Sequence, residues 1–548
     1  MLECNRNAPV AQLDRVSVSE AEGRPFESGR ARQDISHDQQ VRADFWSRTI
    51  HGMDKKHTLM NATFGSRVAE DETEGLHSYF VETEQWRKLL AGDVDIVFGA
   101  KGAGKSALYS LLVTQKETLR LGRRIVILAA ENPRGTPAFR DLTMGAPASE
   151  EEFRVLWKLY FLTLLANYIR HHLSSTGTSN SNAAHVIDIL SENGLLAPNV
   201  TLISRLKAVL NYVRNHMPAV EGALVDPNTG IRLTGRITLG EPTSEQRANG
   251  FLSTDDLLHM TSKAYRETAI TAWLVLDRLD VAFSDSAALE GIALRSLFRT
   301  YLDMLSLSNV QIKIFLRDDI WRKIVGAGFR EASHVTRTLT ISWDQKSLLN
   351  LIVRRLVHNT DICTFYGVKQ EAVLENAGLQ DRFFDRVFPK QIDVGTRQPS
   401  SLDWMLSRTA DGSKRTAPRE LLHLLIGTRD EQLRLYELGG AEPPGENLFD
   451  RSAVRQALPA VSKARYEQTL CAEHPTLKRY LDKLERENTQ QTPESLARIW
   501  GCSVDAAAAR AEQLAEVGFF ELKGAKESPA YWVPFLYRDA LNLVQGAA

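Results

Sequence analysis

The apolar residues of this chain gather in short runs, many of which are aliphatic or β-branched throughout. Runs of this kind, bounded by polar residues, are typical of strands buried in a sheet. We predict five strands from them: Asp95–Phe98, Arg124–Leu128, Trp273–Leu276, Val310–Leu316 and Leu339–Trp343. Between the second and third runs, Ser149 to Leu173 carries apolar residues at helical spacing. Strands that alternate with helices indicate an α/β fold with a parallel sheet.

The segments around this pattern divide the chain. Residues 174–184 and 220–250 are rich in Ser, Asn, Gly and Pro, and we expect loops there. From Asp344 the apolar spacing is helical to about residue 450, before which glycine and proline pairs predict a linker. We therefore expect four parts: an extension over 1–52, a core with a helical insertion over 53–345, a helical lid over 346–450, and a helical linker with a winged helix over 451–548.

The expectation of a winged helix rests on the last hundred residues. Thr492-Pro-Glu and Ser503 are typical of helix starts, and Gly518–Leu522 with Ala530–Val533 predicts a β-hairpin. Such modules bind DNA in replication initiators. Here the expected second helix, 504–517, holds one basic residue against three acidic ones: Arg510 against Asp505, Glu512 and Glu516. That face would repel phosphate, so we expect a protein contact, with DNA still open through Lys523, Lys526 and Arg538.

Composition excludes several classes of protein. The 548 residues include 67 basic and 68 acidic ones, so no net charge attracts the whole chain to nucleic acid or membrane. The 4 cysteines form no Cys-x-x-Cys pair, which fits free thiols in a reducing compartment. The most apolar run, Leu156–Ile169, contains Lys158 and is shorter than the roughly 20 residues of a membrane span. We therefore expect a buried helix there, and a cytoplasmic protein. His171, His172 and His185 lack a partner ligand at metal-binding spacing.

The N-terminal extension has no apolar core of a secretory signal and no regular period. Ala11–Arg15 can be encoded by GCTCAGTTGGATAGA and Phe26–Ser28 by TTCGAATCC, which are similar to the D-arm and T-arm of a bacterial tRNA gene. Residues 10–33 thus resemble a translated tRNA gene, and we expect the true start at Met53 or Met60. A disordered tail is the alternative. A position beside a tRNA gene is typical of genomic islands and suggests a mobile-element or defence role.

The first predicted strand is followed by Gly99-Ala-Lys-Gly-Ala-Gly104-Lys105-Ser106 and then by a helical stretch. Strand, glycine loop and helix in this order match the P-loop pattern GxxxxGK[ST]. Backbone N–H groups of such a loop face phosphate oxygens, Lys105 reaches the β- and γ-phosphates, and Ser106 holds Mg²⁺. We predict that ATP with Mg²⁺ binds through Gly99, Lys101, Gly102, Ala103, Gly104, Lys105, Ser106 and Ala107. Lys101 is also open to a second interpretation, a solvated side chain.

A P-loop ATPase needs a carboxylate from a neighbouring strand to hold magnesium. The buried run Trp273–Leu276 ends at Asp277, at the edge where parallel sheets bind ligands, so Asp277 is predicted to hold Mg²⁺ with Ser106. Replication-type AAA+ proteins commonly have Glu next, but this position is Arg278. Asp280 is the acid that we expect to orient water instead. The alternative for both acids is a turn that only closes a strand.

Two arginines are candidates for sensing the γ-phosphate. Arg317 follows the predicted strand Val310–Leu316 and resembles the sensor 1 arginine of STAND ATPases. Its alternative is an ion pair with Asp318 or Asp319. Arg419 follows Pro418, a residue typical of a helix start, and resembles sensor 2 of AAA+ proteins, which reaches from the lid to the nucleotide.

In their order, these motifs resemble a bacterial family of P-loop ATPases between the AAA+ and STAND/KAP types. The resemblance begins near residue 60 and includes Tyr79-Phe-Val-x-Thr and Tyr531-Trp-Val-Pro. It implies an additional-strand, AAA+/STAND-like parallel sheet with a helical lid and a C-terminal winged helix. It also implies a homo-oligomeric ATPase that acts on a protein or DNA partner, often in defence against foreign DNA.

Other functions remain open at this point. The missing Glu after Asp277 favours an interaction switch that binds ATP with little hydrolysis. A small-molecule kinase would use the loop, but it has no use for the lid and the C-terminal module. Arg354 and Arg355 are candidates for an arginine finger that acts on a neighbouring subunit.

Overall fold

The computed structural model describes residues 54–67, 72, 75–114, 124–132, 139, 149–197, 200–216, 237–279, 286–525 and 528–547. Several sequence predictions lie outside these described residues: the extension over 1–52 with its tRNA-like part, the start at Met53, Asp280, and the possible wing contact Lys526.

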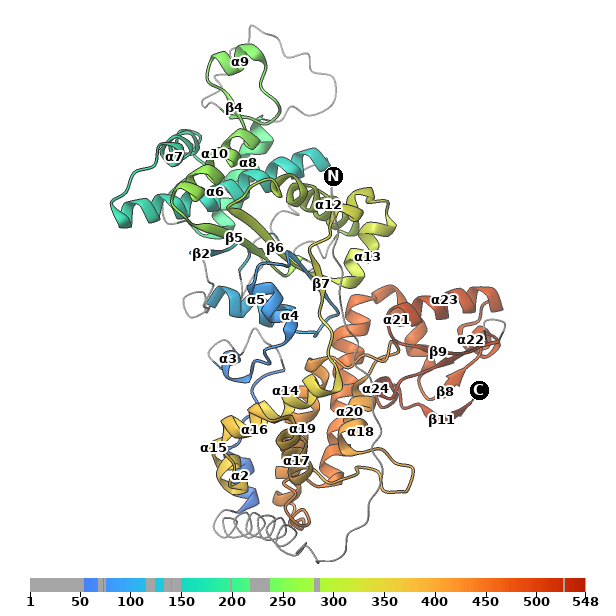
Figure 1. Cartoon of the computed structure of the whole chain (residues 1–548). Coiled ribbons are helices and arrows are strands. Elements are labelled where there is room, and N and C mark those ends of the chain that lie inside the picture. Colours follow the sequence, from blue (N-terminus) through green and yellow to red (C-terminus); the bar gives the residue numbers. More distant parts are fainter. Residues whose placement is uncertain are drawn as a thin grey trace, which may run out of the picture. The chain divides into compact units, whose positions relative to one another are not determined.

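Five parallel strands form the central sheet in the order β2-β5-β6-β1-β7 (Figure 1). They are β1 (Ile96–Gly99), β2 (Ile125–Ala129), β5 (Thr271–Leu276), β6 (Val310–Arg317) and β7 (Thr338–Thr340). All five predicted strands are confirmed, although β7 ends before Ile341. Strand β6 lies between the strand that leads into the glycine loop and the strand that leads into Asp277, as expected of an additional-strand sheet.

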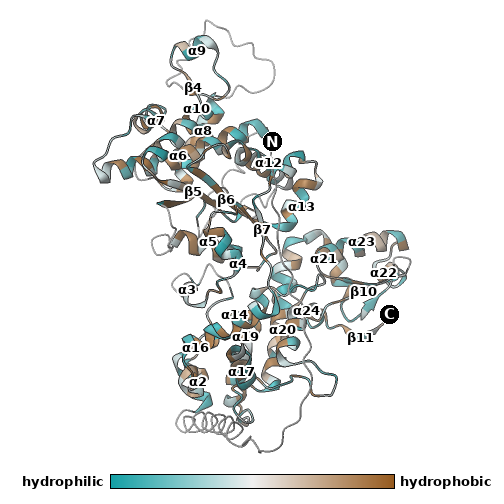
Figure 2. Ribbon diagram, in the orientation of Figure 1, coloured by the Kyte–Doolittle hydropathy of each residue, from teal (hydrophilic) through white to brown (hydrophobic). Residues whose placement is uncertain are grey.

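Side chains of the strands alternate between two buried clusters, one on each face of the sheet. On β5, Leu274 and Leu276 join one cluster, whereas Trp273 and Val275 join the other. Figure 2 shows β5 and β6 largely in the hydrophobic colour. The first face is covered by α6 (Glu150–Thr176), α7 (Ser181–Glu192), α8 (Leu202–His216), α10 (Thr254–Glu267) and α12 (Ala287–Met304). The second is covered by α4 (Glu84–Leu90) and α5 (Lys105–Thr114).

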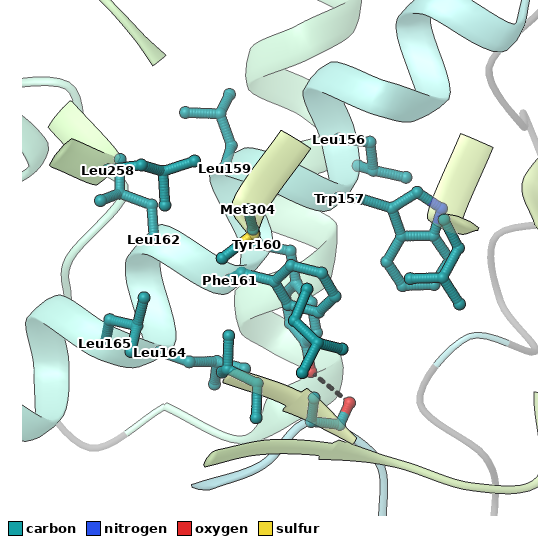
Figure 3. Packing of buried hydrophobic residues seen from close by; sticks show 14 of the residues in the cluster. Leu156, Trp157, Leu159, Tyr160, Phe161, Leu162, Leu164, Leu165, Leu258 and Met304 are labelled. Carbon is teal, nitrogen blue, oxygen red and sulfur yellow. Dashed lines mark hydrogen bonds between the residues drawn. The ribbon is translucent and has the colours of Figure 1, made fainter. Parts of the chain in front are cut away.

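Helix α6 is the apolar run that the sequence assigned to a buried helix. Ser149 caps its N-terminus, and its Trp157, Tyr160 and Leu162 are fully buried (Figure 3). The Tyr160 hydroxyl donates to the Ala130 carbonyl at 2.8 Å, which ties the helix to the end of β2. Across the described ranges, no helix combines the length and the apolar character needed to cross a bilayer.

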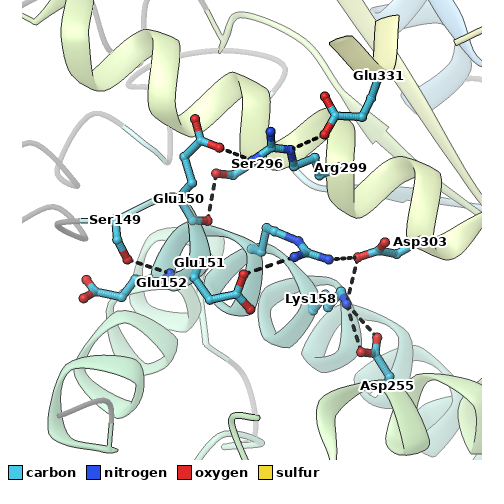
Figure 4. Close-up of polar contacts among 11 residues, drawn as sticks. Ser149, Glu150, Glu151, Glu152, Lys158, Asp255, Ser296, Arg299, Asp303 and Glu331 are labelled. Atoms are coloured by element: carbon cyan, nitrogen blue, oxygen red, sulfur yellow. Dashed lines mark hydrogen bonds and ion pairs between the residues drawn. The ribbon is translucent and has the colours of Figure 1, made fainter. Parts of the chain in front are cut away.

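The charged residue within that run, Lys158, is compensated by two carboxylates. Its Nζ lies 2.8 Å from Asp255 and 2.8 Å from Asp303 (Figure 4). Because a buried cation is unfavourable without such partners, the pairs explain how a lysine is accommodated here. They also connect α6 to α10 and α12.

The two loop predictions were wrong in part. Residues 174–184 contain the end of α6 and the start of α7, whose N-cap Asn180 accepts a hydrogen bond from Ala183 N. The described part of 220–250 contains α9 (Ser244–Ala248), which begins with a capping box. In both places, polar residues that were interpreted as loop are helix caps.

From Asp344 the chain is helical, as predicted. The helices are α14 (Gln345–Val357), α15 (Thr360–Tyr366), α16 (Gln370–Glu375), α17 (Ala377–Val387), α18 (Ser401–Thr409), α19 (Pro418–Glu437) and α20 (Arg451–Arg465). The N-terminal α2 (Lys55–Asn61) packs on this group: Lys55 Nζ donates to the carbonyls of Pro443 and Gly445, each at 2.7 Å. A short α3 (Leu76–Tyr79) leads from there to the core.

The C-terminal segment contains the two helices and the hairpin that the sequence predicted. They are α22 (Pro493–Trp500) and α23 (Val504–Glu516), capped by Thr492 and Ser503, and the antiparallel pair β9 (Glu521–Ala525) and β10 (Ser528–Trp532). Strands β8 (Asn488–Gln491) and β11 (Val544–Ala547) complete a sheet of order β11-β8-β10-β9. Helices α21 (Pro475–Leu481) and α24 (Phe535–Arg538) lie before and after these elements.

Candidate functional site

The glycine-rich loop connects β1 to α5 and takes a backbone path that requires glycine. Gly102 has a φ of +80° and Gly104 a φ of +101°, both in the region that side chains disfavour. Lys105, the first residue of α5, turns back over the loop: its Nζ donates to the carbonyls of Gly99 at 2.8 Å and Ala100 at 3.0 Å. The loop thus presents a helix N-terminus and a lysine at one point, an arrangement suited to an anion.

Asp277 lies directly after β5, at the carboxyl edge of the sheet, and is 2% exposed. It lines the same cavity as Lys105 and Ser106. The next residue, Arg278, has a φ of +59°, which is uncommon for a residue with a side chain. The structure therefore brings the two predicted magnesium ligands, Ser106 and Asp277, to one place.

The cavity has a volume of about 290 Å³ and is lined by both polar and apolar residues. Its polar lining includes the loop from Lys101 to Ala107 together with Asp277, Arg317 and Arg419. Gly99, predicted as part of this set, does not line it. Its apolar lining comes from residues before β1, after β7 and from α14 and α19: Leu76, Tyr79, Phe80, Val81, Ile341, Trp343, Leu351 and Leu422. A concave site with a few converging polar groups on apolar walls is typical of small-molecule pockets.

Arg419, the predicted lid arginine, lies against the glycine loop. Pro418 opens α19, as expected, and places Arg419 in its first turn. A Cβ added at Gly102 would lie 3.1 Å from the Arg419 Cβ and 3.6 Å from the Ala417 Cβ. A residue more than 300 positions away in sequence is thus in contact with the loop through the start of α19.

Arg317 lies at the end of β6, where it both lines the cavity and forms ion pairs. Its guanidinium donates to Asp319 at 3.0 and 2.8 Å and to Glu473 at 2.6 Å. Burial alone would lower the pKa of Arg317, but these carboxylates outweigh burial and raise it. The ion-pair interpretation is therefore confirmed for Asp319, whereas Asp318 instead faces Arg415 at 3.8 Å.

The solvated interpretation of Lys101 was wrong. Its Nζ lies 2.5 Å from a carboxylate oxygen of Glu473, a residue between α20 and α21. No local pattern predicts this pair, because the two residues are far apart along the chain and charged residues on protein surfaces are common.

Arg355, a candidate for a finger reaching a neighbouring subunit, is instead buried inside this chain. Its Nη2 donates to Glu72 at 2.8 Å, its Nη1 donates to the Phe64 carbonyl at 2.8 Å, and its guanidinium lies 4.0 Å from the centre of the Tyr79 ring. The segment before β1 is thereby joined to α14 by two residues that line the cavity, Glu72 and Arg355. Arg354 donates to Asn350 on the same helix.

The described basic residues that were proposed for a wing contact make contacts within the C-terminal segment itself. Arg538 is buried and donates to the Val533 carbonyl and to Gln545, so it does not offer its charge to a phosphate. Lys523 lies over the Trp532 ring at 3.7 Å, and Arg510 lies over Tyr480 at 4.5 Å. Among the described residues, no three or more histidine, cysteine, aspartate or glutamate side chains are grouped so that they could hold a metal ion.

No family model matches the sequence. The chain is 22% identical over 306 residues to the putative transposon gamma-delta 80.3 kDa protein of Escherichia coli (strain K12). The match covers 55% of this chain and 40% of that protein, so it spans less than half of the relative.

Two solved structures are similar at 12% identity: Cdc6p from Pyrobaculum aerophilum and the Aeropyrum pernix ORC2 protein in ADPNP–ADP complexes. Their alignments cover 83% and 87% of this chain and 91% and 94% of those chains, with TM-scores of 0.26 and 0.33. TM-scores this low do not support an argument about this chain. The fold is therefore assigned from the order of the strands in the sheet.

Proposed function

We propose that the protein is a magnesium-dependent ATPase of the AAA+/STAND-like kind, in which the nucleotide changes how the lid meets the core. One observation carries the proposal: the glycine loop, the buried Asp277 and the lid residue Arg419 all line a single cavity. A site that joins two parts of a chain can convert the presence of a ligand into a change between them.

In this proposal the glycine loop takes the phosphates and the apolar residues that line the cavity take the base. Lys105 exchanges its two carbonyl partners for phosphate oxygens, and the N-terminus of α5 adds its partial positive charge. Ser106 and Asp277 supply oxygen ligands, the type that Mg²⁺ prefers, and both face the cavity. The ion, when bound, neutralises charge on the phosphates. Arg419 and Arg317 report the γ-phosphate.

The residue that orients water is proposed to be Asp280, since Arg278 stands at the position next to Asp277. A second candidate function is an ATP-gated interaction switch with little turnover. The same Arg278 favours it, and so does the engagement of Arg317 by Asp319 and Glu473, which leaves its guanidinium already paired.

We further propose that the protein forms homo-oligomers and acts on a protein partner through a C-terminal winged helix. The acidic character of α23 and the buried Arg538 support a protein partner over DNA. A role in a mobile element, or in defence against one, is supported by the tRNA-like segment and by the description of the E. coli relative as a transposon protein.

The test is ATP turnover beside ATP binding in the full chain for wild type, Lys105→Ala, Asp277→Asn and Asp280→Asn. Asp188→Asn, an exposed acid on α7, is the matched control. We expect turnover by wild type and the control, none by Asp277→Asn, and binding without turnover by Asp280→Asn. If wild type binds ATP but turns it over no faster than Lys105→Ala, the switch function replaces the enzyme. A phosphorylated small-molecule product would instead indicate a kinase.

A further inference from the structure

The chain between the lid and the C-terminal sheet contains an irregular turn. Helix α20 runs directly into a π-helical turn, Tyr466–Cys471, which is followed by Glu473, His474 and then α21. Single π turns are rare within helices and occur frequently at functional sites. Glu473 follows this turn as the last helical residue before His474.

Glu473 bridges two cations that border the candidate site. Its carboxylate lies 2.6 Å from Arg317 Nη2 and 2.5 Å from Lys101 Nζ, and its side chain is 15% exposed. Both cations line the cavity of the glycine loop, and both also line a second cavity of about 950 Å³, to which Glu473 belongs. Glu473 therefore contacts Lys101 and Arg317 from the second cavity, and it does not line the cavity of the glycine loop.

The segment that carries Glu473 is anchored to the lid, and its π turn also meets the chain before β1, since Arg67 Nη2 donates to Gln468 at 3.3 Å. Arg465, the last residue of α20, pairs with Glu420 of α19 at 3.0 Å and with Asp411 at 3.6 Å. The Gly412 N–H donates to the Gly518 carbonyl at 2.7 Å, which ties the chain after α18 to the hairpin. Arg317, in contrast, is the last residue of β6, and Lys101 lies in the glycine loop that follows β1. The Glu473 contacts thus connect the core to the lid and C-terminal sheet.

We propose that Glu473 is a latch that competes with the terminal phosphate of a nucleoside triphosphate for Arg317 and Lys101. This inference rests on the proposed function of the same site. A terminal phosphate carries more negative charge than one carboxylate and accepts forked hydrogen bonds from arginine, so it can displace Glu473. A diphosphate lacks that group and leaves the latch closed.

Two consequences follow from this competition. When Glu473 moves away, Arg317 keeps its two hydrogen bonds to Asp319. Opening of the latch therefore does not leave the buried charge of Arg317 unpaired. Linkage is reciprocal: if the triphosphate opens the latch, then a chain without the latch must bind the triphosphate more tightly by the same factor. The protein would then report triphosphate to its C-terminal sheet without needing hydrolysis.

The experiment compares the full chain with Glu473→Gln and with Glu467→Gln, an exposed glutamate on the same π turn. Affinities for a non-hydrolysable ATP analogue and for ADP are measured for each, with thermal unfolding as a check on folding. Glu473→Gln is expected to bind the analogue at least about fivefold more tightly, the lower end of usual couplings, with ADP affinity unchanged. Glu467→Gln is expected to match wild type for both.

Hydrogen exchange of residues 466–481 in wild type supplies a second readout. The analogue is expected to accelerate exchange there, whereas ADP is not. The latch is refuted if Glu473→Gln binds the analogue no more tightly than Glu467→Gln, or if analogue and ADP give the same exchange. Absence of binding of either nucleotide by all three proteins would refute the proposed function itself, which is a distinguishable outcome.

Discussion

Arg419 of the lid contacts Gly102 of the glycine-rich loop so closely that a Cβ at position 102 would lie 3.1 Å from the Arg419 Cβ. The glycine loop and the start of α19 therefore share one contact surface.

Gly102→Ala tests the contact between loop and lid. Gly102 and Gly177 both have positive φ, +80° and +64°, but nothing lies within 4 Å of a Cβ at Gly177. Each alanine substitution should lower the free energy of unfolding by about 1–2 kcal/mol, because both place a Cβ in the left-handed region. Only Gly102→Ala should also weaken ATP binding. Equal ATP affinities for the two variants would contradict the contact.

Arg419→Ala tests the lid arginine as a phosphate ligand. Removing a hydrogen bond to a charged group should weaken ATP binding by about tenfold or more, while ADP binding changes less. Arg434→Ala, an exposed arginine on the same α19, is the control and should match wild type. The affinities can be measured by calorimetry. A loss of ADP binding as large as the loss of ATP binding would rule out a γ-phosphate role.

Arg355→Ala tests whether this arginine supports the fold. Its removal leaves Glu72 buried without its partner, so the free energy of unfolding should fall by about 3–5 kcal/mol. Arg354→Ala, which loses a bond to Asn350, should fall much less. Urea unfolding gives both values. Two results together would contradict a structural role: Arg355→Ala keeps its stability but loses turnover, and mixing it with Lys105→Ala, which keeps Arg355, restores turnover. They would support Arg355 as a finger that acts on a neighbouring subunit.

The pH dependence of the latch follows from the pKa of Glu473. Burial raises it, but the charges and hydrogen bonds of Arg317 and Lys101 outweigh burial, so the folded-state pKa lies below its usual value. Because the folded-state pKa is lowered, the ionised carboxylate stabilises the contact above the unfolded-state pKa of about 4.3. This stabilisation is lost as the pH falls through the folded-state pKa. The analogue affinity of Glu473→Gln relative to wild type should therefore stay constant between about pH 8 and about pH 6. If the two proteins bound the analogue equally well at any pH within this range, the ionised Glu473 would not be the group that competes with the phosphate.

Much of the core could be predicted from local sequence. The β-branched runs determine the strands, and the glycine loop after β1 and Asp277 after β5 follow from strand ends that meet at one edge of a parallel sheet. Pro418, Thr492 and Ser503 mark helix starts correctly, because capping is a local interaction.

The contacts between distant parts could not be predicted. Lys101 and Glu473 have no local signal for each other, and the same holds for Glu72 and Arg355. Arg538 is charged and lies near the end of the sequence, yet it is buried and donates a hydrogen bond to the Val533 carbonyl. Asn180 resembles a loop residue but caps α7, since the residues favoured in turns are also the favoured caps.

Equilibrium binding of Mg·ATP is the measurement that decides whether the glycine loop is a nucleotide site. The full chain is titrated by calorimetry as wild type, as Lys105→Ala and as Lys88→Ala, an exposed lysine on α4. We expect saturable binding by wild type and Lys88→Ala, and at least tenfold weaker binding by Lys105→Ala, since a hydrogen bond to a charged group contributes about 1.5–3 kcal/mol. Equal affinity of all three proteins, or no binding by wild type, would contradict the nucleotide site.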